Sequence, residues 1–233
     1  MRYLLCALLA TAALRPAEAP ARAPVLVELF TSEGCSSCPP ADRLLQQLDS
    51  RAVVLSEHVT YWNQEGWKDP YSSEEWTARQ AAYGKRFSLD APYTPDMVVD
   101  GAVEFGGDMT KRSVEEIAMA ASQPKVDLRL TRTGDSIRVD AAASSLAGGV
   151  YLALADDHDE SKVSAGENKG VELSHVAVLR SIRKIGAIKR DSSFSQTVRL
   201  PYGSAAERVV VFVQDQGPGK IHGAAMLPPA SAP

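Results

Sequence analysis

The sequence is poor in cysteine, in aromatic residues and in runs of basic residues. Its 233 residues include only three cysteines, too few for disulfides to hold a chain of this length together. Aromatic residues make up 6% and hydrophobic residues 45%, which is the composition of an ordinary globular protein and not of a disordered or collagen-like chain. The formal charge of −4 and the lack of any Lys/Arg run longer than two argue against a nucleic-acid-binding surface.

Long apolar runs are also lacking. The N-terminal run from Tyr3 to Leu14 has 12 residues, against about 20 for a membrane-spanning helix, so a membrane anchor is the weaker interpretation. Arg2 precedes this run, and a segment of small residues ending in Ala19-Pro20-Ala21 follows it, which is the layout of a secretory signal peptide. We therefore predict cleavage after Ala21, a mature protein without a stable membrane anchor, and a periplasmic or secreted location.

The pattern of apolar residues divides the mature chain into two parts. In the first part, periodicity predicts strands at 25–30, 52–59, 96–100 and 102–105, and helices at 39–48, 72–87 and 110–121. Ser72 and Glu75 have capping-box spacing at the start of the second helix. In the second part, β-prone runs without long helices lie at 126–130, 136–141, 150–155, 175–180, 194–200 and 208–214. We predict an α/β sandwich at 22–123, a smaller all-β sandwich domain at 124–227, and a flexible tail at 228–233.

Cys35 and Cys38 lie where the first predicted strand meets the first predicted helix. Backbone N–H groups and the helix dipole favour negative charge there, and lowering a thiol pKa from about 8.5 to about 7 requires roughly 2 kcal/mol. We predict that Cys35 is the attacking thiolate at a water-accessible position and that Cys38 resolves the mixed disulfide. Pro39 and Pro40 fit best in a first helical turn, so an alternative is that Cys38 caps the helix and the order of roles differs.

Three other uses of this cysteine pair stay open. A structural disulfide is one, although closing a four-residue loop stabilises a protein by only about 1.9 kcal/mol, against about 4.7 kcal/mol for a 100-residue loop. A second is a copper or zinc site in which His58, at the end of the second predicted strand, joins Cys35 and Cys38 but leaves the fourth ligand unfilled. A third is a binding module that keeps the fold without redox turnover.

Two motifs carry a family resemblance. A strand, Cys-x-x-Cys, a helix and a later Pro opening a hairpin resemble the thioredoxin superfamily over residues 25–122, although Gly34 stands where a Trp is common. More closely, the segments ELFTSEGCSSCPPAD at 28–42, GWKDP at 66–70 and YTPDMVVDG at 93–101 are similar to bacterial secreted proteins catalogued as domain of unknown function 1223. The resemblance implies a thioredoxin-like fold for the first part of the chain and names relatives without naming an activity.

The superfamily pattern also implies roles for three further residues. Pro95 corresponds to the cis-proline that precedes a hairpin strand, and a cis bond there turns the Thr94 backbone toward an extended substrate. Glu28 interrupts the first apolar strand and resembles the buried acid that relays a proton to the inner cysteine. The alternatives are an ordinary loop proline and a carboxylate at a sheet edge facing water.

Other conspicuous residues have weaker interpretations. His175 could reach the cysteines only if the two parts of the chain fold over one another. The acidic run at 156–160 lacks EF-hand spacing and is interpreted as a solvated loop. Trp62, Trp67 and Trp76 either pack an inserted segment against the domain or form an aromatic platform for substrate, with packing favoured.

Together these patterns predict an exported thiol-disulfide oxidoreductase. Its catalytic residues would be Cys35, Cys38 and Glu28, and Thr94 and Pro95 would bind the substrate. The expected partner is a protein or small-molecule thiol or disulfide, without a nucleic acid, a cofactor or a bound metal.

Overall fold

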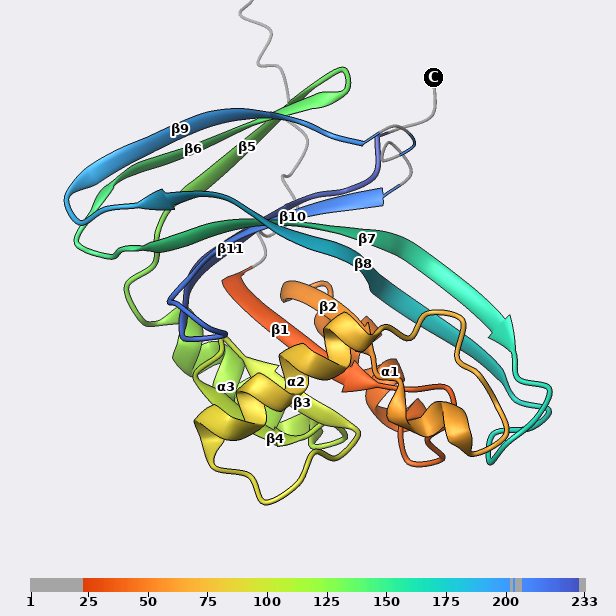
Figure 1. Cartoon of the computed structure of the whole chain (residues 1–233). Coiled ribbons are helices and arrows are strands. Elements are labelled where there is room, and N and C mark those ends of the chain that lie inside the picture. The colour runs from red at the N-terminus through yellow and green to blue at the C-terminus, as the bar shows by residue number, and fades with distance from the viewer. Residues whose placement is uncertain (1–22, 202, 204–206, 231–233) are drawn as a thin grey trace, which may run out of the picture.

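The computed structural model describes residues 23–201, 203 and 207–230 (Figure 1). The predicted signal peptide at 1–21 and residues 231–233 of the predicted tail lie outside the described residues. None of the described helices is both long enough and apolar enough to cross a membrane. The described part of the chain is a mixed α/β structure, in which three α-helices pack around one large sheet and a smaller second sheet.

The large sheet has eight strands in the order β11-β10-β7-β8-β2-β1-β3-β4. The parallel pairs are β1 with β2 and β2 with β8, and the other neighbours are antiparallel. The strand bounds are β1 Ala23–Thr31, β2 Ala52–His58, β3 Asp96–Val99, β4 Val103–Gly106, β7 Gly148–Lys162, β8 Glu172–Ile188, β10 Glu207–Gln214 and β11 Ile221–Leu227.

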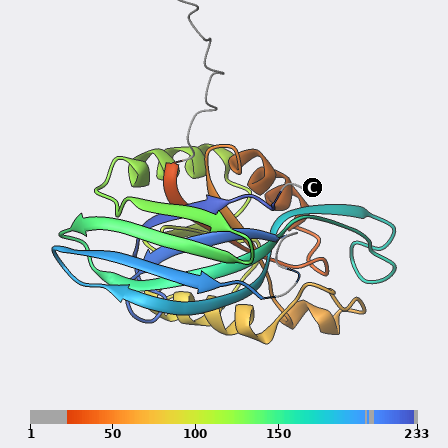
Figure 2. The same ribbon diagram turned by 90° about the horizontal axis from the view of Figure 1, so that it is seen from above.

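The helices cover both faces of this sheet (Figure 2). Helices α1 (Pro39–Leu48) and α3 (Thr110–Ala121) lie on one face, and α2 (Glu74–Phe87) lies on the other, preceded by the short 3-10 helix η1 (Tyr61–Gln64). Because successive side chains of a strand point to opposite faces, alternate residues of β1 belong to different cores. Val27 and Leu29 pack in the core that includes α1 residues, whereas Phe30 packs with Tyr83 of α2.

A second sheet, in the order β5-β6-β9, covers the other half of the large sheet. Its strands are β5 Leu128–Thr133, β6 Ser136–Ser144 and β9 Ser192–Arg199. The β5 strand alternates between half-buried and exposed residues, as expected for a strand with one face in water. The inward side chains of the two sheets share an apolar core that includes Ile137, Val139, Leu152 and Val211.

The two predicted parts of the chain share the large sheet. Strands from beyond residue 124 continue the sheet of the first part, with Ser56 of β2 beside Val178 of β8. Asp100 strengthens this connection, because its backbone oxygen accepts from Ile221 N–H at 2.7 Å and its side chain binds Lys125. In the second part of the chain, β7, β8, β10 and β11 therefore belong to the large sheet, and β5, β6 and β9 form the small sheet.

Most element positions agree with the sequence pattern, and three differ. The N-cap of α2 is Ser73 and not Ser72, because the Ser73 hydroxyl accepts from Glu75 N–H at 3.1 Å. Strand β11 was not predicted, since the run at 221–227 contains glycine and no β-branched residue after Ile221. The acidic run at 156–160 is not a loop but part of β7, paired with β8 in a long hairpin.

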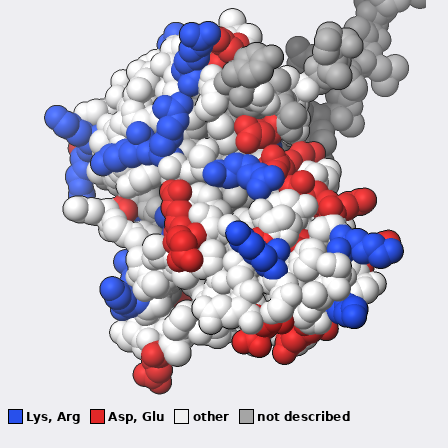
Figure 3. Space-filling model, turned by 45° about the vertical axis from the view of Figure 1, so that its right-hand side comes forward, with Lys and Arg blue, Asp and Glu red and all other residues white. Residues whose placement is uncertain are grey.

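Charges of both signs are interspersed on the surface. On the face that Figure 3 shows, several Lys and Arg side chains adjoin one another at the upper left, and elsewhere Lys and Arg side chains lie among Asp and Glu side chains.

Candidate functional site

Cys35 and Cys38 form a disulfide at the end of β1, with their Cα atoms 5.4 Å apart. Helix α1 begins at Pro39, with Cys38 as its N-cap and two prolines in its first turn. This outcome agrees with the alternative in which Cys38 caps the helix, because prolines need no hydrogen bond for their nitrogens in the first turn. Cys35 therefore lies in the turn before the helix, where its backbone oxygen accepts from Cys38 N–H at 3.1 Å.

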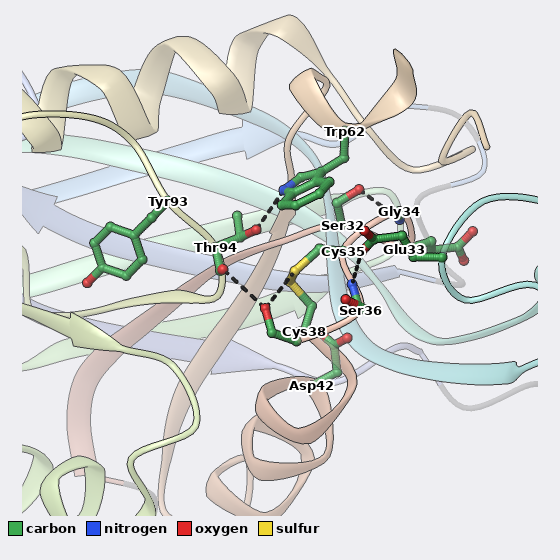
Figure 4. Close-up of a disulfide and its surroundings, with 12 residues drawn as sticks. Ser32, Glu33, Gly34, Cys35, Ser36, Cys38, Asp42, Trp62, Tyr93 and Thr94 are labelled. Carbon is green, nitrogen blue, oxygen red and sulfur yellow. Dashed lines mark hydrogen bonds between the residues drawn. A yellow bond between two sulfur atoms is a disulfide. The ribbon is translucent and has the colours of Figure 1, made fainter. Parts of the chain in front are cut away.

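The prediction of a water-accessible Cys35 is wrong for this structure. Both cysteines have no exposed surface, although Ser36 and Ser37 between them are exposed. Trp62 of η1 lies beside the disulfide and packs on Gly34, where an added Cβ would be 3.0 Å from the Trp62 Cβ (Figure 4). The Trp62 side chain thus packs beside Gly34, the position at which the thioredoxin superfamily commonly has a tryptophan of its own.

The Thr94–Pro95 peptide bond is cis, as predicted, and lies next to the disulfide. The Thr94 backbone oxygen is 3.5 Å from the Ser37 hydroxyl, which is 3.3 Å from the Cys35 sulfur. The Trp62 indole N–H donates to the Thr94 hydroxyl at 2.7 Å. Thr94, Trp62 and Ser37 therefore lie on one side of the disulfide, and Figure 4 shows Thr94 and Trp62 beside it.

A buried network of charges holds the loop that leads to Cys35. The Asp69 carboxylate accepts from Glu33 N–H at 2.8 Å and lies 2.7 Å from His58 Nδ1. Burial lowers the pKa of His58, but the neighbouring Asp69 outweighs this and raises it above the ordinary value. Burial likewise raises the pKa of Asp69, but His58 outweighs this and holds it below the ordinary value. His58 and Asp69 are therefore a buried ion pair that fixes the loop.

His175 of β8 joins the same network. Its Nε2 is 3.3 Å from a Glu33 carboxylate oxygen, and its ring centroid is 4.7 Å from that of His58. The two parts of the chain thus fold over one another here. Burial raises the pKa of Glu33, but hydrogen bonds with His175, Ser161 and Trp67 outweigh it and hold the pKa below the ordinary value.

Asp42 is the buried carboxyl group that follows Cys38 by one helical turn. It is 5% exposed, and its backbone N–H donates to the Cys38 oxygen at 3.1 Å. Burial raises the pKa of Asp42 above its ordinary value, and the charges of His175 and His58 offset only part of the rise. Residues four apart on a helix share a face, so Asp42 lies on the same face of α1 as the N-cap residue Cys38.

The predicted role of Glu28 is not supported by its position. Its carboxylate accepts from Arg79 Nε at 2.8 Å and from the Tyr83 hydroxyl at 2.6 Å, both on α2. Helix α2 covers the opposite face of the sheet from α1 (Figure 2). Glu28 alternates with Val27 and Leu29 along β1, so its side chain points to the face that α2 covers. Glu28 is thus a buried ion-pair residue and does not lie against the cysteines.

The proposed metal ligand His58 does not join the cysteines. Its Nδ1 binds Asp69, and its ring packs against His175 and Tyr71. Within the described part of the chain, no three or more His, Cys, Asp and Glu side chains are grouped so that they could hold a metal ion.

The three tryptophans have different surroundings. Trp76 is 2% exposed and packs in the main core, as the packing interpretation expects. Trp67 donates to Glu33 Oε2 at 2.7 Å, and Trp62 lies on the disulfide. Sequence reasoning missed the contributions of Asp69 and Asn168 to this site. Asp69 stands in the GWKDP segment that carries the family resemblance, whereas no motif marks Asn168.

A second buried carboxyl group lies directly after Pro95. The Asp96 side chain accepts from Gln80 Nε2 at 3.2 Å, while its other oxygen has no hydrogen-bond partner in the part of the chain that the structure describes. Burial, followed by interaction with Glu104, raises the pKa of Asp96 to about 7. Since this folded pKa exceeds the value near 3.9 of an unfolded chain, the Asp96 carboxyl favours folding at low pH, and this contribution is lost as pH rises from about 4 to 7.

Asp96→Asn is expected to remove this pH dependence, because the amide stays neutral at every pH. The free energy of unfolding of the variant should exceed that of the wild type at pH 7.5 by at most about 4 kcal/mol and by much less at pH 4.5. Urea unfolding at four pH values measures the difference, with the exposed Asp108→Asn as the control. Parallel pH profiles for Asp96→Asn and the wild type would contradict it.

The solved structures that resemble this chain include the following two. The crystal structure of protein AGR_C_4864 from Agrobacterium tumefaciens has a TM-score of 0.78 and 27% identity, covering 91% of this chain and 97% of that chain. HBP35 of Porphyromonas gingivalis has a TM-score of 0.60 at 14% identity, covering 93% of this chain and 79% of that chain, which is a likeness of fold alone. The comparison with curated proteins gives no match. A family model described as protein of unknown function (DUF1223) matches residues 26–214, and the chain therefore belongs to this family.

Proposed function

We propose that this protein is an exported thiol-disulfide oxidoreductase that exchanges electrons with protein or small-molecule thiols through Cys35 and Cys38. The observation that carries the proposal is the Cys35–Cys38 disulfide beside the cis Thr94–Pro95 bond. A disulfide that closes only four residues contributes little to stability, so its position at the end of a strand beside exposed Ser36 and Ser37 favours exchange over a structural role.

The strand order around the disulfide supports a thioredoxin-like interpretation. The sequence β1-α1-β2-α2-β3-β4-α3 forms a sheet in the order β2-β1-β3-β4, with β1 and β2 parallel and β3 antiparallel to β1. This arrangement brings the carboxyl end of β1 next to the start of β3, which is why residues 35 and 95 meet.

The reaction is a balanced exchange of two thiols and one disulfide. In the reducing direction, the Cys35 thiolate attacks a substrate disulfide, forms a mixed disulfide and releases one substrate thiolate, which takes up a proton. The Cys38 thiol then loses its proton and attacks the Cys35 sulfur, which restores the Cys35–Cys38 disulfide and releases the second substrate thiolate. The oxidising direction is the reverse. Asp42, rather than Glu28, is the carboxyl group placed on the Cys38 side of the sheet.

Trapping of the mixed disulfide tests this proposal. Reduced Cys38→Ser protein incubated with oxidised glutathione is expected to accumulate one glutathione adduct at Cys35, because no inner thiol can displace it. The reduced wild type should instead return to its internal disulfide. The Cys35→Ser variant should show no adduct at position 35, because it has no thiol there. Mass spectrometry with peptide mapping identifies the adduct.

A redox titration distinguishes the oxidoreductase from a redox-inactive binding module. A redox titration of the wild type should give a potential between about −270 and −120 mV, the range of thioredoxin-like exchange proteins. If Cys38→Ser captures glutathione no faster than an unstructured cysteine peptide, and the wild type stays oxidised throughout that range, the redox-inactive binding module replaces the proposal.

A further inference from the structure

The end of the β7–β8 hairpin lies on the loop that contains Cys35. We define the cap as residues 163–171, which join β7 to β8, and Figure 1 shows the hairpin extending beyond the rest of the sheet to reach this loop. Asn168 is 6% exposed, and its side-chain amide donates to the backbone oxygens of Glu33 at 2.8 Å and of Cys35 at 3.0 Å. The cap therefore covers the chain on both sides of Gly34.

The Glu167 carboxylate accepts a hydrogen bond from a backbone N–H group next to Cys35. Its carboxylate accepts from Ser36 N–H at 3.2 Å, and Ser36 lies between Cys35 and the start of α1. Backbone N–H groups in this turn are what would stabilise a Cys35 thiolate. A carboxylate in their place has the opposite effect, because it repels a developing negative charge on the neighbouring sulfur.

The cap is attached to the loop by few interactions of its own. Its ends are closed by the Val163 N–H to Val171 oxygen bond at 3.0 Å and the Gly170 N–H to Val163 oxygen bond at 2.8 Å. Below the cap, Ser161 and His175 hold the hairpin to Glu33. Gly166 of the cap also packs on the neighbouring loop, where an added Cβ would be 3.1 Å from the Trp67 Cβ. The cap can thus separate from residues 33–36 by losing the bonds of Asn168 and Glu167 and this packing, while the body of the hairpin stays in place.

We propose that the cap is an internal regulator of the disulfide: it shields Cys35 and disfavours its ionised form, and a redox partner has to displace residues 163–171 before exchange. The inference rests on the proposed function and adds a partner requirement to it. Small reductants reach the disulfide only during transient opening, whereas a macromolecular substrate that binds the cap opens the site as it docks.

Asn168→Ala tests the shielding. The variant loses both amide bonds of the cap, so reduction of the Cys35–Cys38 disulfide by dithiothreitol is expected to be about tenfold faster than in the wild type. In this step, one dithiothreitol is oxidised to its cyclic disulfide while the protein gains two thiols. Glu172→Gln is the matched control, because Glu172 is on the same hairpin but its carboxylate lies by Lys162, at 3.7 Å. An unchanged rate for a folded Asn168→Ala variant, or an equal rise in the control, would overturn the shielding.

Glu167→Gln tests the electrostatic effect without loss of shape. In the Cys38→Ser background, the midpoint of the pH profile of Cys35 alkylation by iodoacetamide is expected to fall by about half a pH unit, and peptide mapping assigns the label. The shift should shrink at high salt, since Glu167 is exposed. Glu172→Gln should leave the profile unchanged. A Glu167→Gln profile that superimposes on its parent would refute the electrostatic part of the proposal.

Neither readout needs a redox partner or turnover. Absence of glutathione trapping both in Cys38→Ser and in Cys38→Ser combined with Asn168→Ala, which releases the cap, would reject the oxidoreductase function while leaving the cap measurable. Wild-type exchange combined with unaltered Asn168→Ala and Glu167→Gln behaviour would reject the cap alone.

Discussion

Arg79→Met is expected to lower the free energy of unfolding by about 3 to 5 kcal/mol at pH 7. Arg79 lies between two carboxylates with no exposed surface: it binds Glu28, and its Nε is 3.6 Å from Glu57 Oε2. Among the described residues, neither Glu57 oxygen has a hydrogen-bond partner. Burial, followed by the charge of Glu28, raises the pKa of Glu57 well above the ordinary value. Without the guanidinium, two buried acids face each other.

The pH dependence distinguishes this effect from a simple loss of packing. In the variant, the raised pKa of Glu57 would no longer be offset by the Arg79 charge, so it stays above the value of about 4.3 in the unfolded chain. The unfavourable contribution of the buried Glu57 carboxylate therefore grows as pH rises above that value, so acidification should restore part of the stability of Arg79→Met. Adding Glu57→Gln to the variant should recover stability at pH 7. Urea unfolding measures both effects, with the exposed Lys85→Met on the same helix as the control.

Arg79→Met that unfolds with the same pH profile as the wild type would show that Glu28 and Glu57 find other compensation. This outcome would also reopen the question of how β1 tolerates a carboxylate at position 28.

Asp69→Asn is expected to destabilise the protein by about 3 kcal/mol at pH 6 and to loosen the loop before Cys35. Three donors bind the two Asp69 oxygens: His58 Nδ1, Glu33 N–H and, at 2.9 Å, Tyr71 N–H. An amide has one oxygen and one donor group, so at least one of these donors would face another donor. His58 would also lose the anion that balances its charge in a buried position.

The two partners set the pH window in which the difference is largest. The raised pKa of His58 gives stability that is present below about 6.5 and is lost as pH rises through the folded value. The lowered pKa of Asp69 gives stability that is present above about 3.9 and is lost as pH falls through the folded value. The loss in Asp69→Asn should therefore be greatest between about pH 4 and 6.5.

A double-mutant cycle with His58→Asn isolates the pair, and its coupling energy should be at least 1 kcal/mol. The exposed Asp90→Asn serves as the control for a general charge effect. Additive effects of Asp69→Asn and His58→Asn would show that the two side chains contribute independently, which contradicts the ion pair inferred from the 2.7 Å contact.

Local pattern was sufficient for most of the secondary structure. Helices α1 and α3 begin and end at the predicted residues, because apolar spacing and the paired prolines determine them within one segment. The cis Thr94–Pro95 bond followed from the family resemblance and not from local chemistry. Strand β11 pairs with β10 and β7 pairs with β8, each the neighbouring strand along the chain, but glycine in β11 and the acidic run in β7 are untypical of strands, so their own residues predicted them poorly.

Some residues of the site were identified from the sequence, and others only from the structure. Residues 35 and 38 were identified from the sequence because their spacing fits a disulfide across one turn. Trp62, Asp69, His175 and Asn168 come to the disulfide and the loop before it from separate segments, and only Asp69 lies in a segment that carries the family resemblance. Glu28 was assigned to the cysteines because strand position alone does not say which face a side chain occupies, and that face depends on which helix covers it.

The amino-acid sequence by itself determined that a close cysteine pair would end the first strand and that an α/β unit would hold it, because these features depend on neighbouring residues. Only the tertiary structure decided that the pair is buried, which carboxyl groups lie near it, and that a hairpin from the other half of the chain covers it. Those properties depend on contacts between residues more than 100 positions apart, such as Ser36 with Glu167, which local propensity does not encode.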